Sequence, residues 1–277
     1  MIFDLHSHTN YSDGALSPSD LLARAVAMQV DTLAITDHDT VDGLKAFFAA
    51  KPIAAMLPIN LVAGIELSTQ WQSTGIHVLG LNIDPGSTAI IEAASIQMEA
   101  RRQRAEQISV NLEKQGISGA LEGAQQQSGG QFIGRPHFAQ WMVAQGKVKN
   151  MQAAFKQYLG AGKAGDVKQH WADLPQVIEW IRGAGGIAVL AHPLKYKLTR
   201  TRLKRFLNDF IKAGGQGIEV VSGQQQLHET AGMADLCVEK GLLASCGSDF
   251  HAPGKRWSEL GRFAALPAKV TPVWDRF

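Results

Sequence analysis

The sequence predicts an α/β protein, a (β/α) barrel or a close variant of one, that carries a helical insertion. Two observations support this prediction. Short apolar runs alternate with helix-favouring stretches in the first and last parts of the 277-residue chain, while the part between them favours helices and has no strand signal. A histidine or a carboxylate also follows nearly every apolar run. A doubly wound open sheet is the alternative, because it shows the same alternation.

The first part of the chain contains four predicted strands, each a short apolar run: residues 2–5, 31–36, 61–65 and 75–83. Helical spacing predicts two helices between them, over residues 17–29 and 42–50. Either Ser17 or Ser19 can cap the first of these helices, because a serine side chain accepts a hydrogen bond from the first helical turn.

The strand pattern then stops. Residues 88–115 form one long, charged, helix-favouring segment, and shorter helical stretches follow it. We therefore expect a helical insertion over residues 98–168, which acts as a lid over the substrate, and a barrel formed by residues 1–97 and 169–277. Strands resume in three further apolar runs: residues 186–191, 217–221 and 242–247. Helices between short apolar strands indicate parallel strands joined by right-handed crossovers.

The composition is that of a soluble globular enzyme. Hydrophobic residues make up 45% and charged residues 19% of the chain, and the formal net charge is only +2. A basic nucleic-acid tail is therefore excluded, although a local basic patch would suffice for a polyanion. The two cysteines, Cys237 and Cys246, lack the spacing of a sulfur-ligated zinc site. The N-terminus does not resemble a signal peptide and no stretch is long and apolar enough for a membrane span, so we expect a cytoplasmic protein.

Nine potential metal ligands lie at or near the ends of the predicted strands: His6, His8, Asp13, His38, Glu66, His77, His192, Asp249 and His251. In a parallel barrel the C-terminal ends of the strands converge on one rim, where active sites are built. Side chains dispersed along the chain would therefore meet in one pocket. A single histidine there is usually an ordinary polar residue, and Asp37, Asp39 and Asp42 could equally be helix caps. The complete set is far more specific.

The residue types indicate the kind of metal. His6 and His8 lie on the same side of an extended segment, so both rings can face one ion. Histidines mixed with carboxylates suit manganese, zinc or iron better than magnesium or calcium, which prefer oxygen ligands. Nine ligands are too many for one tetrahedral ion, so we expect two or three ions, with Glu66 as a bridge between them.

Six segments resemble, in sequence and in order, the PHP (polymerase and histidinol phosphatase) family: DLHSHTNYSDG, ITDHDT, GIELS, IHVLG, AHP and GSDFH. They run from residue 4 to residue 251. The resemblance implies a distorted (β/α)7 barrel, a trinuclear metal site and the hydrolysis of phosphate esters. It implies one ion held by His6, His8, Glu66 and Asp249, a second by Asp13, His38 and His251, and a third by Glu66, His77 and His192. Manganese is the expected metal, with zinc or iron as alternatives.

The expected mechanism is metal-assisted hydrolysis, in which a hydroxide bridging two ions attacks phosphorus. The residues expected to be catalytic are therefore metal ligands: His6, His8, Asp13, His38, Glu66, Asp249 and His251. The sequence does not choose between Asp37, His38 and Asp249 as the group that moves protons.

The insertion indicates the substrate. Its segments ARRQRAEQI and IGRPHF resemble the branch of the family that acts on nucleoside 3′,5′-bisphosphates and on the 5′ ends of RNA. Four residues are predicted substrate contacts, because guanidinium and imidazole groups bind phosphate: Arg101 and Arg104, with Arg102 beside them, and Arg135 and His137. His137 could instead be a metal ligand, and the arginines near residue 101 could be a solvated helix face. The expected partner is a nucleotide or short RNA, with no membrane and no obligate protein partner.

Three other functions are compatible with parts of the pattern. A histidinol-phosphate phosphatase would share the metals but would not need arginines in an insertion. An amidohydrolase that cleaves C–N bonds also begins with His-x-His, but it fits the Asp13, His38 and Glu66 series poorly. A non-catalytic metal-bound module would be expected to have lost ligands. Two further features have modest predicted roles: Glu219 as a structural hydrogen-bonding group, and the basic residues from Lys195 to Arg205 as a polyanion-steering or merely solvated helix start.

Overall fold

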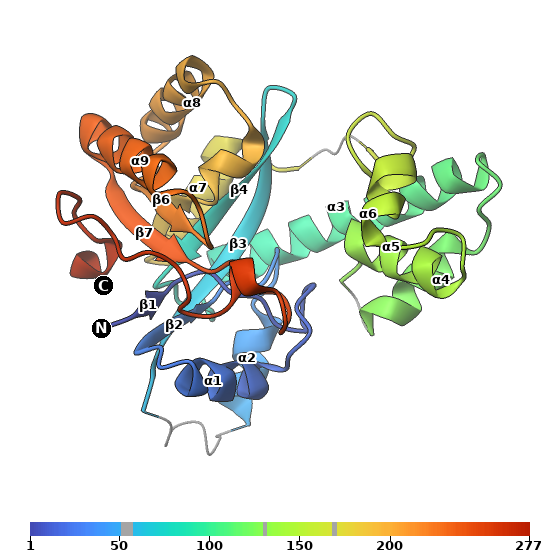
Figure 1. Cartoon of the computed structure of the whole chain (residues 1–277), viewed down its shortest axis with the longest axis horizontal. Coiled ribbons are helices and arrows are strands. Elements are labelled where there is room, and N and C mark those ends of the chain that lie inside the picture. The colour runs from blue at the N-terminus through green and yellow to red at the C-terminus, as the bar shows by residue number, and fades with distance from the viewer. Residues whose placement is uncertain (51–57, 130–131, 168–170) are drawn as a thin grey trace.

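Seven strands form the centre of the molecule. The computed structural model describes residues 1–50, 58–129, 132–167 and 171–277. Within these ranges the strands follow one another around a single sheet in chain order: β1 (Phe3–Asp4), β2 (Thr32–Ile35), β3 (Asn60–Trp71), β4 (Thr74–Leu81), β5 (Ile187–Leu190), β6 (Gly217–Ser222) and β7 (Leu243–Gly247). Figure 1 shows this sheet curling round on itself, with both termini on the same side.

The first and last strands meet, so the sheet is a nearly closed barrel. The backbone N–H of Leu5 donates to the carbonyl of Cys246 over 3.0 Å, and the N–H of Asp249 donates to the carbonyl of His6 over 2.9 Å. Closure leaves no long unpaired edge between β1 and β7. The predicted (β/α)7 barrel is therefore confirmed, and the open doubly wound sheet is not observed.

One strand departs from the prediction. β4 is antiparallel to both neighbours, β3 and β5, whereas all other pairs are parallel. The expected crossover helix before β4 is absent, because β3 runs on past Glu66 to Trp71 and turns through Gln72 and Ser73 directly into β4. Two residues can only join antiparallel strands, so the prediction of a uniformly parallel barrel was wrong at this point.

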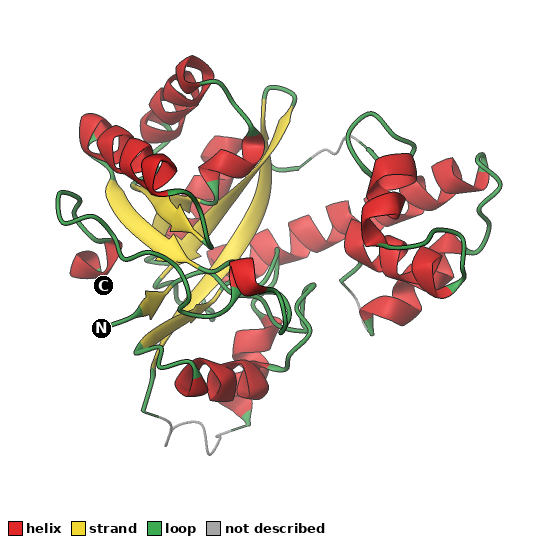
Figure 2. Cartoon of the chain, in the orientation of Figure 1, coloured by secondary structure: helices red, strands yellow, loops and turns green. Residues whose placement is uncertain are grey.

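Helices cover the outside of the barrel (Figure 2). They are α1 (Pro18–Ala27), α2 (Asp42–Ala49), α7 (Leu174–Gly183), α8 (Arg200–Lys212) and α9 (Leu227–Lys240). The predicted cap of the first helix is confirmed for Ser17, whose side chain accepts from the N–H of Asp20. Apolar faces of these helices pack on the barrel strands, as in the cluster that includes Phe206, Ile218 and Leu236.

The long predicted helix is α3 (Thr88–Glu113), which extends from the barrel into a separate group of helices (Figure 1). That group contains α4 (Ala120–Ser128), α5 (Arg135–Ala144), α6 (Met151–Ala154) and a π-helical turn (Phe155–Leu159). It has a hydrophobic cluster of its own, centred on Phe138, Met142 and Leu159. The expected boundary at residue 98 falls inside α3, and the one at 168–169 falls outside the described residues, so the division into two units stays a prediction. None of the described helices is both long and apolar enough to cross a membrane.

Candidate metal centre

The nine predicted ligands lie together at one rim of the barrel. The seam between β1 and β7 places four of them, because His6 and His8 follow β1 while Asp249 and His251 follow β7. Backbone hydrogen bonds across this seam, such as that from the N–H of His8 to the carbonyl of Phe250 (2.9 Å), fix the two loops side by side. His38 and His192 follow β2 and β5 at the same rim.

His77 reaches the cluster by a different route from the one predicted. It lies in the first half of β4, and since β4 runs in the reverse direction, this half is at the rim where the other strands end. His77 pairs across the ladder with Ser68, two residues beyond Glu66 on β3. Side chains at such positions share one face of a sheet, so His77 points to the same side as Glu66.

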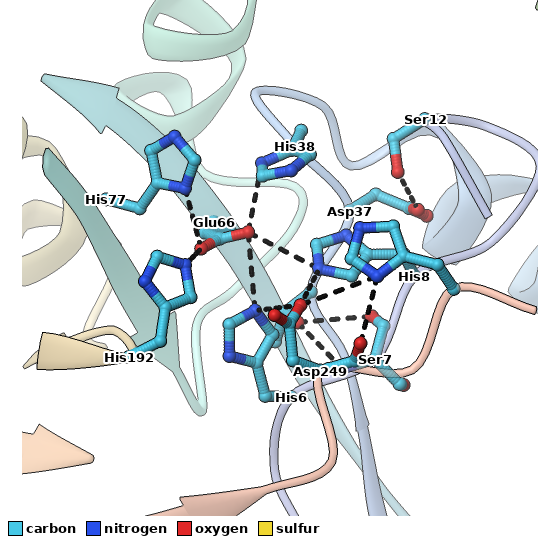
Figure 3. Close-up of polar contacts among 12 residues, drawn as sticks. His6, Ser7, His8, Ser12, Asp37, His38, Glu66, His77, His192 and Asp249 are labelled. Atoms are coloured by element: carbon cyan, nitrogen blue, oxygen red, sulfur yellow. Dashed lines mark hydrogen bonds and ion pairs between the residues drawn. The ribbon is translucent and has the colours of Figure 1, made fainter. Parts of the chain in front are cut away.

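Glu66 is the centre of the cluster (Figure 3). Its side chain is fully buried, and its two oxygens face different histidines. Oε1 lies 3.0 Å from both His77 Nδ1 and His192 Nε2. Oε2 lies 2.9 Å from His38 Nδ1, 3.3 Å from His6 Nε2 and 3.4 Å from His8 Nε2. A carboxylate that faces two sets of histidines in this way can bridge two cations, as the sequence predicted.

Four overlapping groups of side chains could each hold one ion: His8, Asp13, His38 and His251; His6, His8 and Asp249; His6, Glu66 and His192; and His38, Glu66 and His77. Together they contain all nine predicted ligands. The grouping differs from the expected division into three ions. His6, His8 and His38 each belong to two groups, and His77 and His192, which were expected on one ion, fall in separate groups.

Buried polar atoms without partners test whether cations fit this cluster. Seven atoms of the predicted ligands are buried and accept or donate no hydrogen bond within the described ranges: His6 Nε2, His8 Nδ1, His8 Nε2, Asp13 Oδ1, His38 Nδ1, Glu66 Oε2 and His192 Nδ1. Leaving so many polar atoms unsatisfied in a protein interior would be costly. All of these atom types can donate a lone pair to a metal, so the residues present fit a set of divalent cations.

The pKa values of His8 and Glu66 favour the ionisation states that metal ligands need. Burial lowers the pKa of His8, and the neighbouring His251 and His38 rings lower it further, so this imidazole stays neutral. Burial raises the pKa of Glu66, but the surrounding His38, His6 and His77 outweigh it and hold the pKa well below its usual range. The Glu66 carboxylate is therefore ionised.

The raised pKa of His6 shows that the carboxylates around it favour a positive charge at this position. Burial lowers the pKa of His6, yet the carboxylates of Glu219 and Glu66 outweigh burial and raise the pKa to about 10. A proton binds His6 strongly because the negative charges of both carboxylates stabilise the protonated ring. A divalent ion meets the same demand with more charge.

Glu219, predicted as a structural hydrogen-bonding group, orients two of the histidines. Its Oε1 lies 3.0 Å from His6 Nδ1, and its Oε2 accepts from the backbone N–H of His192 over 2.6 Å. This contact fixes which ring nitrogen of His6 is left for a metal. His192 and Asp249 have positive φ angles of 28° and 54°, so the backbone is held in the left-handed region at two of the predicted ligands.

The helix-cap interpretation of Asp37 and Asp39 was wrong. The cap position of α2 is Val41, which makes no side-chain cap bond. Asp37 instead accepts from Thr9 and Ser12, with Oδ1 2.6 Å from Ser12 Oγ and Oδ2 2.6 Å from Thr9 Oγ1 (Figure 3). Both carboxylate oxygens are therefore engaged in holding the loop that leads to Asp13, which makes Asp37 the weakest of the three proton-transfer candidates.

A cavity of about 440 Å³ opens next to the cluster, and we call it the first cavity. It reaches Asp13, His38 and His77 on one side and Arg104 and Arg135 of the insertion on the other. Burial, together with the positive charges of Arg135 and Arg101, lowers the pKa of Arg104 to about 9. Arg104 Nε is buried without a hydrogen-bond partner, and neither Arg104 nor Arg135 forms an ion pair within the described part of the chain. The carboxylate of Asp166, which also lines the cavity, raises the pKa of both arginines but forms no ion pair with either, so an anionic ligand can still bind them.

The other predicted substrate contacts lie in different surroundings. Arg101 lines the first cavity, but its Nε donates to Asp39 over 2.6 Å and its Nη2 to Ser68 over 3.0 Å. Arg102 lies on the exposed face of α3, paired with Glu99 and Glu106, so the predicted clamp does not include it. His137 accepts the N–H of Gly134 at Nδ1 and lies outside the four possible metal groups.

Sequence reasoning missed several residues of the cavity wall. Phe132 and Trp171 both lie against the Arg101 guanidinium, with its carbon 4.3 and 5.2 Å from their ring centres. Tyr196 Oη accepts from the backbone N–H of His77 over 2.9 Å. Lys195 was predicted only as part of the basic run, but it contacts the Asp249 carboxylate. No short-range pattern predicts these contacts, since each joins parts of the chain that are far apart.

The comparison with protein families agrees with the arrangement of the site. Residues 4–182 match the family described as the PHP domain. The chain belongs to the PHP family. The match begins at β1 and ends in α7, so it includes the loops that carry His6, His8 and His38 as well as the β3–β4 hairpin.

Curated relatives are similar to this PHP-family protein over nearly its whole length. The protein named 5′-3′ exoribonuclease Rnm from Escherichia coli is 46% identical over 276 residues, which is 99% of this chain and 93% of the relative. The 3′,5′-nucleoside bisphosphate phosphatase of Chromobacterium violaceum is 42% identical and covers 98% of this chain and 94% of its own.

Solved structures show the same fold. A structure from Chromobacterium violaceum, described as an amidohydrolase with bound sulfate and no metal, has a TM-score of 0.91 at 42% identity and covers 100% of this chain and 95% of its own. A provisionally named metal-dependent phosphoesterase from Bifidobacterium adolescentis has a TM-score of 0.79 at 26% identity and covers 98% and 92%.

Proposed function

We propose that this chain hydrolyses the bond between phosphorus and O3′ in nucleotides that carry a 5′-phosphate. Its substrates would be nucleoside 3′,5′-bisphosphates and the 5′ ends of short RNA. The observation that carries the proposal is the first cavity, in which Arg104 and Arg135 form no ion pair within the described residues and lie opposite the histidine–carboxylate cluster. A phosphate on the arginines and a second phosphate on the metals would occupy both ends of the cavity.

One bond accounts for the names of both kinds of relative, the exoribonuclease and the bisphosphate phosphatase. A nucleoside 3′,5′-bisphosphate and the first nucleotide of 5′-phosphorylated RNA have the same 5′ end, and in both a phosphorus is bonded to O3′. They differ only in what else this phosphorus carries. An enzyme that recognises the 5′-phosphate and cleaves at O3′ would therefore act on both.

The residues of the chain have separable tasks in this reaction. Arg104 and Arg135 would bind the 5′-phosphate and so fix the position of O3′ at the metal centre. The nine ligands, with Glu66 as a bridge, would hold two or three divalent ions. Manganese is our first choice of metal, with zinc or iron as alternatives. When bound, these ions lower the pKa of water and neutralise charge on the phosphate oxygens.

The decisive experiment gives three substrates to manganese-loaded protein: adenosine 3′,5′-bisphosphate, a 5′-phosphorylated RNA oligomer and histidinol phosphate. We expect phosphate from the first, a 5′-mononucleotide from the second and little turnover of the third. Product identity is read by liquid chromatography. Turnover of histidinol phosphate alone would support the alternative phosphomonoesterase, and turnover of none of the three would support a non-catalytic metal-bound module.

Arg135→Ala is expected to raise KM for adenosine 3′,5′-bisphosphate by roughly 10- to 100-fold, because a charge-assisted hydrogen bond contributes about 1.5–3 kcal/mol. Adenosine 3′-monophosphate lacks the 5′-phosphate, so the same variant should leave its already high KM unchanged. Arg102→Ala is the matched control, since Arg102 lies on the exposed face of α3 and pairs with Glu99 and Glu106. An equal rise of KM for both substrates would contradict recognition of the 5′-phosphate by Arg135.

A further inference from the structure

A second cavity, of about 920 Å³, adjoins the metal centre. Asp13, Asp249 and His251 form its inner wall. It shares Asp13 and Lys195 with the first cavity, and also Pro136 and Phe155 of the insertion, whereas His38 and His77 line the first cavity alone. The two cavities therefore adjoin each other between the metal cluster and the insertion, and each extends past different metal ligands. A molecule that fills both would pass across the metal centre.

The outer walls of the second cavity come from two parts of the chain. One wall is the insertion, through Gln126 and Gln127 of α4 and Gln140 of α5. The other is the loop after His251, which carries the short 3₁₀ turn η4 (Arg256–Ser258) on the side of the barrel that faces the insertion (Figure 1). The reaction at O3′ of a single nucleotide needs neither wall.

The charge of the second cavity suits a polyanion. Its described lining contains two carboxylates, Asp13 and Asp249, and both belong to the metal cluster. Its cations are Lys195 and Lys255, and its other polar groups are mainly neutral amides and hydroxyls. Lys255 is exposed and makes no ion pair within the described ranges, so it can bind a phosphate without losing a partner.

Trp257 presents an aromatic ring at the same wall. The residue is 64% exposed, although the backbone around it is fixed: the carbonyl of Trp257 accepts the N–H of Gln224 over 2.8 Å, and the N–H of Ser258 donates to the backbone carbonyl of Lys255 over 3.1 Å. An exposed tryptophan on a fixed turn keeps a large apolar surface in water, which is unusual for a residue of this type. Such a ring can stack on any nucleic-acid base.

We propose that the second cavity binds the nucleotides of an RNA substrate that follow the scissile phosphate, with Trp257 stacked on a base and Lys255 on a backbone phosphate. This inference rests on the proposed function and assigns a site to the part of the substrate that a mononucleotide lacks. The first cavity holds the 5′-terminal nucleotide, and the downstream chain leaves the metal centre through the second.

The products of the reaction would be divided between the two cavities in the same way as the substrate. The oxygen of water forms a bond to phosphorus, the bond between phosphorus and O3′ breaks, and O3′ takes a proton. The released mononucleotide then carries a 3′-hydroxyl and lies in the first cavity. The phosphate stays on O5′ of the shortened RNA, which lies in the second cavity and has regained a 5′-phosphate. For adenosine 3′,5′-bisphosphate the same step releases inorganic phosphate in place of the shortened RNA.

The test compares two substrates. Lys255→Ala and Trp257→Ala should each lower kcat/KM for a 5′-phosphorylated pentaribonucleotide about tenfold, since stacking and phosphate contacts are each worth 1 to a few kcal/mol. Neither should change kcat/KM for adenosine 3′,5′-bisphosphate by more than about twofold. Trp257→Phe should retain most of the RNA activity, because phenylalanine also stacks. Binding of 3′-labelled RNA to metal-free protein, measured by fluorescence anisotropy, should weaken by the same factor.

Lys212→Ala and Phe48→Ala are matched controls, because each removes an exposed side chain of the same kind outside both cavities. Equal losses on both substrates, or RNA cleavage that neither Lys255→Ala nor Trp257→Ala alters, would overturn the inference. Wild-type protein that hydrolyses the bisphosphate but not RNA would overturn it while keeping the phosphatase activity. Protein inactive on both substrates would refute the proposed function itself.

Discussion

Glu66→Gln is expected to lower kcat/KM for adenosine 3′,5′-bisphosphate by about a thousandfold or more. The substitution keeps the size of the side chain but removes the negative charge that faces five histidine rings. An amide is a weaker ligand than a carboxylate and cannot offset the charge of two cations, so at least one ion should be lost. Losing a group that places charge at a reacting phosphate typically costs 10²–10³-fold, and losing an ion costs more.

The measurement is metal content per chain, by plasma mass spectrometry, together with steady-state kinetics. Wild-type protein should bind two or three ions and the variant at least one fewer. Glu219→Gln is the comparison, because Glu219 contacts His6 Nδ1, whereas Glu66 faces His6 Nε2, and Glu219 orients His6 and His192 without belonging to a possible metal group. It should reduce activity by roughly 10- to 100-fold with most of the metal retained. A Glu66→Gln protein with full metal content and activity would exclude a bridging role.

The site could be predicted from the sequence because it depends on one rule of architecture. Strand ends converge on a barrel rim, so a polar residue after each apolar run is brought to the same place whatever its distance along the chain. His6 and Asp249 are 243 positions apart, yet His6 Nε2 lies 3.5 Å from Asp249 Oδ1. The spacing of the short apolar runs was enough to locate the strands. The predicted ligands were then the histidines and carboxylates at or near the ends of these strands.

The reversed strand could not be predicted in the same way. Hairpin turns of two residues usually contain Asn-Gly or Asp-Gly, because these residues accept positive φ angles. Here Gln72 adopts φ of 54° and Ser73 follows it, so the usual sequence signal is missing. His77 was nevertheless placed correctly at the rim, since the first half of a reversed strand lies where its parallel neighbours end.

The walls of the two cavities were the least predictable part. Arg101 was interpreted as a phosphate contact from its spacing to Arg104 on a helix, and that spacing does place both on one face. Spacing carries no information on what packs against the face. The partner of Arg101 is Asp39, 62 positions earlier, and the ring that covers it is Phe132, in the insertion. Only the folded chain brings these three together.

Arg101→Met is expected to lower the free energy of unfolding by about 3–5 kcal/mol, because it leaves the carboxylate of Asp39 buried without its counter-ion. Asp39 Oδ1 also accepts from the backbone N–H of Ser68 over 2.7 Å, and the N–H of Asp39 donates to the carbonyl of Glu66 over 2.9 Å. The ion pair therefore joins α3 to the strand and loop that carry Glu66 and His38. Thermal unfolding followed by circular dichroism should show a decrease in Tm of roughly 10 °C.

A double variant tests whether the unpaired charge is the cause. Asp39→Asn in the Arg101→Met background removes the charge but keeps an oxygen for the N–H of Ser68, so it should recover part of the lost stability. Arg102→Ala, one residue along α3 on its exposed face, should leave Tm unchanged. The same proteins separate the two roles of Arg101. A residue that only binds substrate would raise KM when replaced and leave Tm at the wild-type value, whereas a residue that holds α3 against the metal loops would lower Tm even without substrate.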